Sequence, residues 1–211
     1  MSRTADIPSP NSDQEPLNVY LALTAGILSV SIGSILIRLA QADQMPSILI
    51  AASRVFLAAL VLTPITLRRH SAILRGLKRS DLALALISGI FLAIHFAAWV
   101  TSLEYTSVLL STVIVTSSPI WVALLEFVFL RSRLPRLVII GLIVAIAGGL
   151  LISFAGESTA TSSSQNDLLG AGLSLVGAIA VAVYLIIGRR LGRELPLLPY
   201  IWLVYGFAGL I

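Results

Sequence analysis

The chain of 211 residues is 57% hydrophobic and only 11% charged, with a mean hydropathy of +0.99. Because soluble domains carry about 25% charged residues, this composition indicates a membrane protein and excludes a soluble globular domain. The absence of cysteine excludes disulfides, cysteine nucleophiles and cysteine metal sites, and the net charge of +4 resides in basic clusters between apolar runs rather than in a nucleic-acid-binding surface.

Residues 1–16 are polar and rich in proline and serine, and we expect them to form a disordered cytoplasmic tail. They are not a signal peptide, because the apolar run that follows is too long for one. Seven apolar segments then predict transmembrane helices, since each segment must satisfy its own backbone within the bilayer. These segments span residues 17–40, 45–67, 82–103, 107–130, 137–154, 168–188 and 195–211, with a polar external loop at 155–167.

Lysine and arginine cluster in alternate connections between these segments. The connections at 68–79, 131–136 and 189–193 carry eleven basic residues, whereas those at 41–44, 104–106 and 155–167 carry none. The positive-inside rule therefore predicts that the basic connections and the N-terminus are cytoplasmic, in a multi-pass protein of the cell membrane (plasma or inner). Arg38 and Arg54 fall within segments instead.

An internal repeat is indicated by charge more than by identity. Aligning Pro46 with Pro196 superposes the first two segments on the last two, and the loop before Pro46 lacks the arginines that precede Pro196. This reversal is typical of the inverted repeats of secondary transporters. We expect one five-helix repeat over 17–154 and the start of a second over 168–211, so that seven of ten helices are present and the chain is a fragment of a longer carrier.

Ionisable side chains within membrane segments are costly and usually face the bundle interior or a cavity. Arg54 and His95 enter from opposite ends but reach comparable depths, roughly 13 and 20 Å at about 1.5 Å per residue. We expect both to face a central cavity, where Arg54 would attract an anionic or carboxylate-bearing solute. The alternatives are that Arg54 caps the carbonyls of a neighbouring helix and that His95 forms an ordinary interhelical hydrogen bond. The candidate cavity-lining residues are Arg54, His95, Trp99, Thr112, Thr116, Pro119 and Tyr184.

Segment 107–130 contains two further features. Pro119 lies mid-segment and frees a carbonyl one turn earlier, which Thr116 or the neighbouring serines can satisfy. Glu126 has two readings: it pairs with Arg131 or Arg133 at the interface, or it is a coupling carboxylate that carries protons. The chain contains no G-x-S-x-G, H-E-x-x-H or phosphate-loop motif, so we expect neither an enzyme nor a bound cofactor or metal.

The motif His95-Phe96-x-x-Trp99, the run Ser102-Leu103-x-Tyr105-Thr106-Ser107-Val108 and the later Pro119 resemble the EamA-type branch of the drug/metabolite transporter superfamily. The Gly-rich end of the fifth segment, at 141–152, fits the close of the repeat of that family. The resemblance implies a ten-helix inner-membrane carrier, built from two inverted repeats, that exports or exchanges small metabolites or drugs. One departure is that the Leu-Gly-Glu-Arg common in the family after the fourth segment reads Leu130-Arg131-Ser132-Arg133 here, so the role of that acid is not carried over.

We therefore expect an all-α polytopic membrane protein that acts as a secondary transporter by alternating access. Its partners would be a small-molecule substrate and the lipid bilayer, and not nucleic acid. The alternative is a non-transporting membrane scaffold or a remnant of such a carrier. The sequence leaves the oligomeric state open, including a homodimer.

Overall fold

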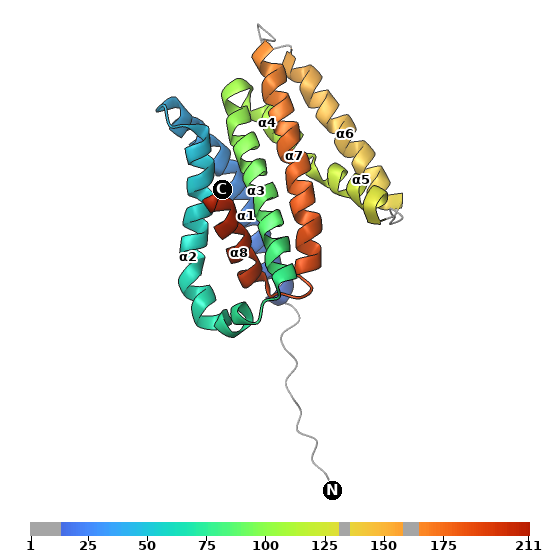
Figure 1. The fold of residues 1–211 in the computed structure, drawn as a ribbon. Helices are drawn as coiled ribbons and strands as arrows, with labels where there is room; N and C mark the ends of the chain where they lie inside the picture. Colours follow the sequence, from blue (N-terminus) through green and yellow to red (C-terminus); the bar gives the residue numbers. More distant parts are fainter. Residues whose placement is uncertain (1–13, 131–135, 158–164) are drawn as a thin grey trace.

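The computed structural model describes residues 14–130, 136–157 and 165–211, and within these ranges all regular secondary structure is α-helical (Figure 1). The helices are α1 (Gln14–Ala42), α2 (Ser47–Arg75), α3 (Arg79–Tyr105), α4 (Val108–Thr116), α5 (Ser118–Leu130), α6 (Arg136–Glu157), α7 (Gln165–Leu191) and α8 (Leu197–Leu210). Most of the predicted tail at 1–16 and of the polar loop at 155–167 lies outside the described residues.

The prediction of an all-α polytopic membrane protein is confirmed. Five helical stretches are long and apolar enough to cross a bilayer, and a shorter apolar helix follows them. The five are Val19–Ala42, Ser47–Arg75, Arg79–Tyr105, Val108–Phe129 and Asn166–Leu191, and the shorter helix is Leu197–Leu210.

Two of the predicted segments take a different form in the structure. The segment expected at 45–67 belongs to a longer helix, α2, which continues to Arg75 and bends at His70, where the backbone is not helical (φ −128°, ψ 17°). The single segment expected at 107–130 consists of two helices, α4 and α5, which meet at Ser117. The length of an apolar run therefore indicates that a segment can span the bilayer. It does not give the full length of the helix or show whether the helix is continuous.

Helix α3 is the centre of the bundle, and it packs against α1, α2, α4, α8 and, most extensively, α7. One buried apolar cluster joins α2, α3, α7 and α8, and a second joins α1, α2 and α3. Phe96 packs against both clusters, so it marks the level of α3 at which they meet. Most apolar side chains of α1 are exposed, as expected for a surface that faces lipid tails.

Three buried serine hydroxyls join α3, α4 and α7. The hydroxyl oxygens of Ser102 and Ser111 lie 2.7 Å apart, and Ser174 donates to Ser111 at 3.1 Å. Hydrogen bonds between membrane helices contribute on average about 0.6 kcal/mol each, so this junction adds modestly to stability. The junction also ties α3 to α7 close to His95 and Trp99, which lie one to two turns earlier on α3.

Helices α2 and α8 pack against each other and run in opposite directions (Figure 1). Each begins directly after a proline, Pro46 or Pro196, with an extended backbone (ψ 132° and 153°). These are the two prolines that the predicted repeat aligns. The basic connections at 68–79 and 189–193 lie at the same end of the bundle (Figure 1). The inverted repeat and the cytoplasmic location of this end stay predictions.

Candidate solute-binding site

Arg54 lies on α2 within a membrane-spanning stretch, with its guanidinium against aromatic side chains of α3. Its Cζ atom is 5.5 Å from the ring centroid of Phe96 and 5.6 Å from that of Trp99. Gly33 of α1 lies on the same group, since a Cβ added there would be 3.5 Å from Nη2. Among the described residues, buried Nη1 has no hydrogen-bond partner and no carboxylate lies within ion-pair distance of Arg54. Aromatic faces are therefore the groups that stabilise this cation.

His95 adds a third ring to this group, and it also joins α3 to α7. The imidazole lies 6.0 Å from the ring of Trp99, nearly parallel to it, and meets Phe96 edge-to-face at 4.9 Å. Its Nδ1–H donates a 2.8 Å hydrogen bond to the carbonyl of Gly177, because a carbonyl can only accept. His95 thus makes the interhelical bond that was one of its two readings. We call Arg54, His95, Phe96 and Trp99 the Arg54 cluster.

The indole of Trp99 is 5% exposed, and its Nε1–H is buried without a hydrogen-bond partner in the described part of the chain. The Arg54 cluster therefore contains two unsatisfied polar groups, Nη1 of Arg54 and Nε1 of Trp99. Both are donors, and buried donors without partners are unusual in native structures. A group that completes this site must therefore be an acceptor of hydrogen bonds.

The break between α4 and α5 separates the candidate residues of the fourth segment, with Thr112 and Thr116 on α4 and Pro119 on α5. Pro119 is the second residue of α5, in a first turn where its missing N–H has no intrahelical partner to lose. The Thr116 hydroxyl donates back to the Thr112 carbonyl at 2.7 Å, and Ser117 donates to the Ile114 carbonyl at 2.6 Å. Thr116 and Pro119 are exposed, whereas the Thr112 hydroxyl is buried and unpartnered among the described residues.

Glu126 of α5 forms an ion pair with Arg189 of α7. The sequence suggested Arg131 or Arg133 as partners, and both lie outside the described residues. The Glu126 side chain is 14% exposed and that of Arg189 is 62% exposed, so the pair sits at the rim of the basic end. It joins the first repeat predicted from sequence to the helix that follows it.

Tyr184 of α7 lies in the contact between α7 and α8. Its ring is nearly parallel to that of Tyr200 (15°), with centroids 6.3 Å apart. Both rings belong to the apolar cluster that Phe96 also touches. Tyr184 therefore packs beside the Arg54 cluster and is not part of that cluster.

Arg38, the other arginine within a predicted segment, has a different environment. It donates to the carbonyl of Leu103 near the C-terminal end of α3, where carbonyls lack intrahelical partners. Gln41 donates to the carbonyl of Val100 in the same region at 2.8 Å. A cation at a helix C-terminus also complements the helix dipole. Capping, the alternative role considered for Arg54, is thus the role of Arg38.

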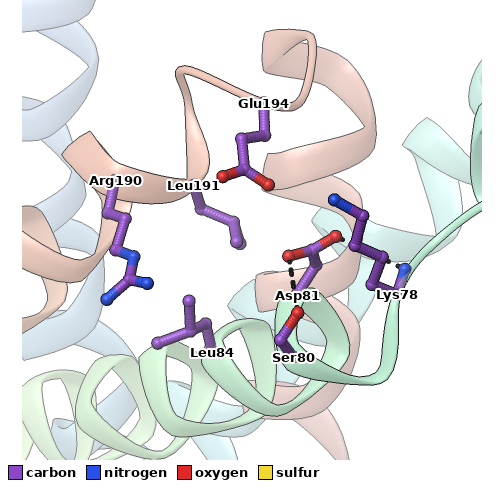
Figure 2. Close-up of a pocket in the computed structure, with 7 residues that line it drawn as sticks. All are labelled: Lys78, Ser80, Asp81, Leu84, Arg190, Leu191 and Glu194. Atoms are coloured by element: carbon purple, nitrogen blue, oxygen red, sulfur yellow. Dashed lines mark hydrogen bonds between the residues drawn. The ribbon is translucent and has the colours of Figure 1, made fainter.

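A small pocket lies at the basic end of the bundle, between the start of α3 and the end of α7 (Figure 2). Asp81 accepts hydrogen bonds there from the Lys78 backbone N–H at 3.3 Å and the Ser80 hydroxyl at 3.2 Å. Arg190 and Glu194 face the pocket from the other side (Figure 2). The sequence did not predict this pocket, because its residues come from two connections far apart in the chain.

Of the predicted site residues, the structure brings together Arg54, His95 and Trp99. Phe96 was quoted as part of a motif but not as a site residue, although it contacts both the guanidinium and the imidazole. The carbonyl of Gly177 is the acceptor for His95. The available signal for Phe96 was its aromatic ring next to His95, whereas no local signal marked the carbonyl.

The fold and this cluster define a polytopic helical membrane protein with a cation held among aromatic rings in its interior. The sequence model of the EamA-like transporter family matches residues 17–154. The chain therefore belongs to the EamA-like transporter family, and the resemblance drawn from its motifs is confirmed.

An uncharacterized transporter of Archaeoglobus fulgidus is 30% identical to this chain over 87 residues. That alignment covers 41% of this chain and 29% of the archaeal protein, so it spans less than a third of the relative. Comparison with solved structures gives no match.

Proposed function

We propose that this protein is a secondary carrier that exports or exchanges small anionic solutes across the cell membrane, with Arg54 as the residue that binds the anion. The observation that carries the proposal is the pair of unpartnered donors in the Arg54 cluster, Nη1 of Arg54 and Nε1–H of Trp99. Membership of a transporter family supports the general activity, and these donors favour a solute that is an anion.

A cation inside a membrane span costs free energy. Insertion scales put an arginine at the centre of a helix at about +2.5–3.5 kcal/mol. Each aromatic face offsets about 0.5–2 kcal/mol of this cost, depending on how far the pair is desolvated. A carboxylate or phosphate would complete the arrangement, because the planar guanidinium binds such groups in a bidentate manner. The rings of Phe96 and Trp99 would then contact apolar parts of the solute.

The contrast with Arg38 argues against a purely structural role for Arg54. Arg38 has a backbone acceptor at the end of α3, and its contribution to stability is explained by that bond. Arg54 has no such acceptor among the described residues. Ionisable groups within membrane segments are rare, and many of them mark solute pathways.

Alternating access is supported by the arrangement of α2 and α8. They are antiparallel, they begin after the two prolines aligned by the predicted repeat, and they pack against each other beside the Arg54 cluster. In inverted-repeat carriers the solute lies at the interface of the repeats, which rock about it. In this proposal the basic connections face the cytoplasm, as the positive-inside rule predicts.

The test uses proteoliposomes loaded with a small-molecule extract, and mass spectrometry follows which solutes leave through the protein. We expect wild-type vesicles to lose a set of solutes enriched in carboxylates or phosphates. Arg54→Gln should abolish this loss, and Arg54→Lys should keep part of it, because lysine retains the charge but not the bidentate geometry.

Arg38→Gln is the matched control, because it removes the other arginine within a predicted segment. It should lower thermal stability without changing which solutes leave. If Arg54→Gln vesicles lose the same solutes at the same rate as wild type, the proposed role of Arg54 is wrong.

A further inference from the structure

The connection between α2 and α3 carries a concentrated positive charge at the membrane border. The apolar part of α2 ends at Leu67, and the helix then bends at His70 and continues to Arg75. Within residues 68–79 five basic side chains, all exposed, follow one another: Arg68, Arg69, Arg75, Lys78 and Arg79. A cluster of four to eight basic residues directly after a membrane helix is typical of surfaces that bind anionic lipid.

The five basic side chains differ in what surrounds them. Lys78 lines the pocket of Figure 2 together with Arg190 and the carboxylates of Asp81 and Glu194. None of the four arginines has a carboxylate within ion-pair distance among the described residues. Arg68, Arg69, Arg75 and Arg79 are therefore a group of four exposed cations within one connection, at the end of the bundle where Arg190 and Arg193 also lie.

The connection is also held against the bundle. Leu77 packs on the apolar cluster that joins α2, α3, α7 and α8. Gly76 ends the helix, and its N–H donates to the carbonyls of Ala72 and Ile73. Since both ends of the connection are tied to helices, the arginines are presented by a fixed segment rather than by a free tail.

We propose that the connection at 68–79 binds the phosphate headgroup of an anionic phospholipid through Arg68, Arg69, Arg75 and Arg79. A lipid fits better than a soluble anion, because Ile73 lies between the arginines with 36% of its surface exposed. An apolar side chain at this level matches the acyl chains below a headgroup and offers nothing to a free phosphate. The charge of the connection thus binds individual lipids as well as orienting the protein.

The experiment measures lipids bound to the purified protein in detergent by native mass spectrometry. Phosphatidylglycerol and phosphatidylcholine with identical acyl chains are offered in equal amounts. We expect wild-type protein to bind phosphatidylglycerol in clear preference. Replacing all four arginines by glutamine should abolish the preference. Each charge removed should lower the affinity for phosphatidylglycerol by about fivefold.

Two further variants separate this surface from general effects of charge or folding. Replacing the same four arginines by lysine should preserve the preference, because lysine keeps the charge. Arg190→Gln combined with Arg193→Gln removes charge at the same end of the bundle and should preserve most of the preference. The proposal fails if the lysine variant loses the preference, if this control loses as much as the glutamine variant, or if the glutamine variant keeps it. It also fails if millimolar inorganic phosphate displaces the bound lipid.

Discussion

The contact between α3 and α8 gives a sharp test of the packing, because the two helices approach so closely at Gly89 that there is no room for a Cβ atom. A Cβ added at Gly89 would lie 2.7 Å from Cβ of Phe207 and 3.1 Å from the carbonyl oxygen of Val204. Carbon atoms prefer separations of about 3.5–4.0 Å, so Gly89→Ala must push the two helices apart by roughly 1 Å. Neither neighbouring atom can move without the backbone of α8.

The expected magnitude follows from two opposing terms. Overpacking of this kind costs about 1–3 kcal/mol, whereas replacing glycine by alanine within a helix gains about 1 kcal/mol. We therefore predict that Gly89→Ala lowers the free energy of unfolding by about 1 kcal/mol, or the Tm by about 2–4 °C for a chain of this size. The assay is thermal unfolding of the purified protein in detergent.

Gly172→Ala is the matched control on α7, because a Cβ there meets nothing within 4 Å. It should leave the Tm unchanged or raise it, since only the gain in helix propensity remains. Equal or higher stability of Gly89→Ala relative to Gly172→Ala would refute the close contact between α3 and α8.

Two further predictions concern the interior and the orientation. His95→Phe removes the hydrogen bond to the Gly177 carbonyl and should lower the free energy of unfolding by about 0.6–1.5 kcal/mol, measured by thermal unfolding. The anion preference attributed to Arg54 should persist in this variant. Loss of that preference would make His95 a solute-binding residue instead. Because the chain has no cysteine, single cysteines report orientation directly: on intact cells a membrane-impermeant maleimide should label Asp43→Cys and not Gly76→Cys, and the reverse pattern would overturn the predicted topology.

The helical class and the family were readable from sequence because they depend on composition and on local motifs. The lengths of the helices were harder to predict from sequence. The continuous apolar run ends at Leu67, but nothing in bilayer thickness prevents α2 from continuing through charged residues to Arg75. The break at Ser117 was signalled by Pro119 only as a local disturbance, since neighbouring helices decide whether a proline bends a helix or separates two.

The site divides in the same way between local and tertiary information. His95 and Trp99 lie four residues apart on α3, so helical geometry alone put them on one face. Arg54 joined them in the structure because α2 packs on that face, which depth in the membrane suggested but did not fix. The pairing of Glu126 with Arg189 joins residues far apart in sequence, and no local pattern identifies such a partner.

The central claim is that Arg54 selects solutes by negative charge. The most direct measurement compares uptake of labelled benzenesulfonate and benzenesulfonamide into proteoliposomes, since both share one aromatic ring but only the sulfonate is an anion. We predict that wild-type protein accumulates the sulfonate over the sulfonamide and that Arg54→Gln abolishes this difference. Equal uptake of the sulfonate by wild-type and Arg54→Gln vesicles, at whatever level, would contradict the claim.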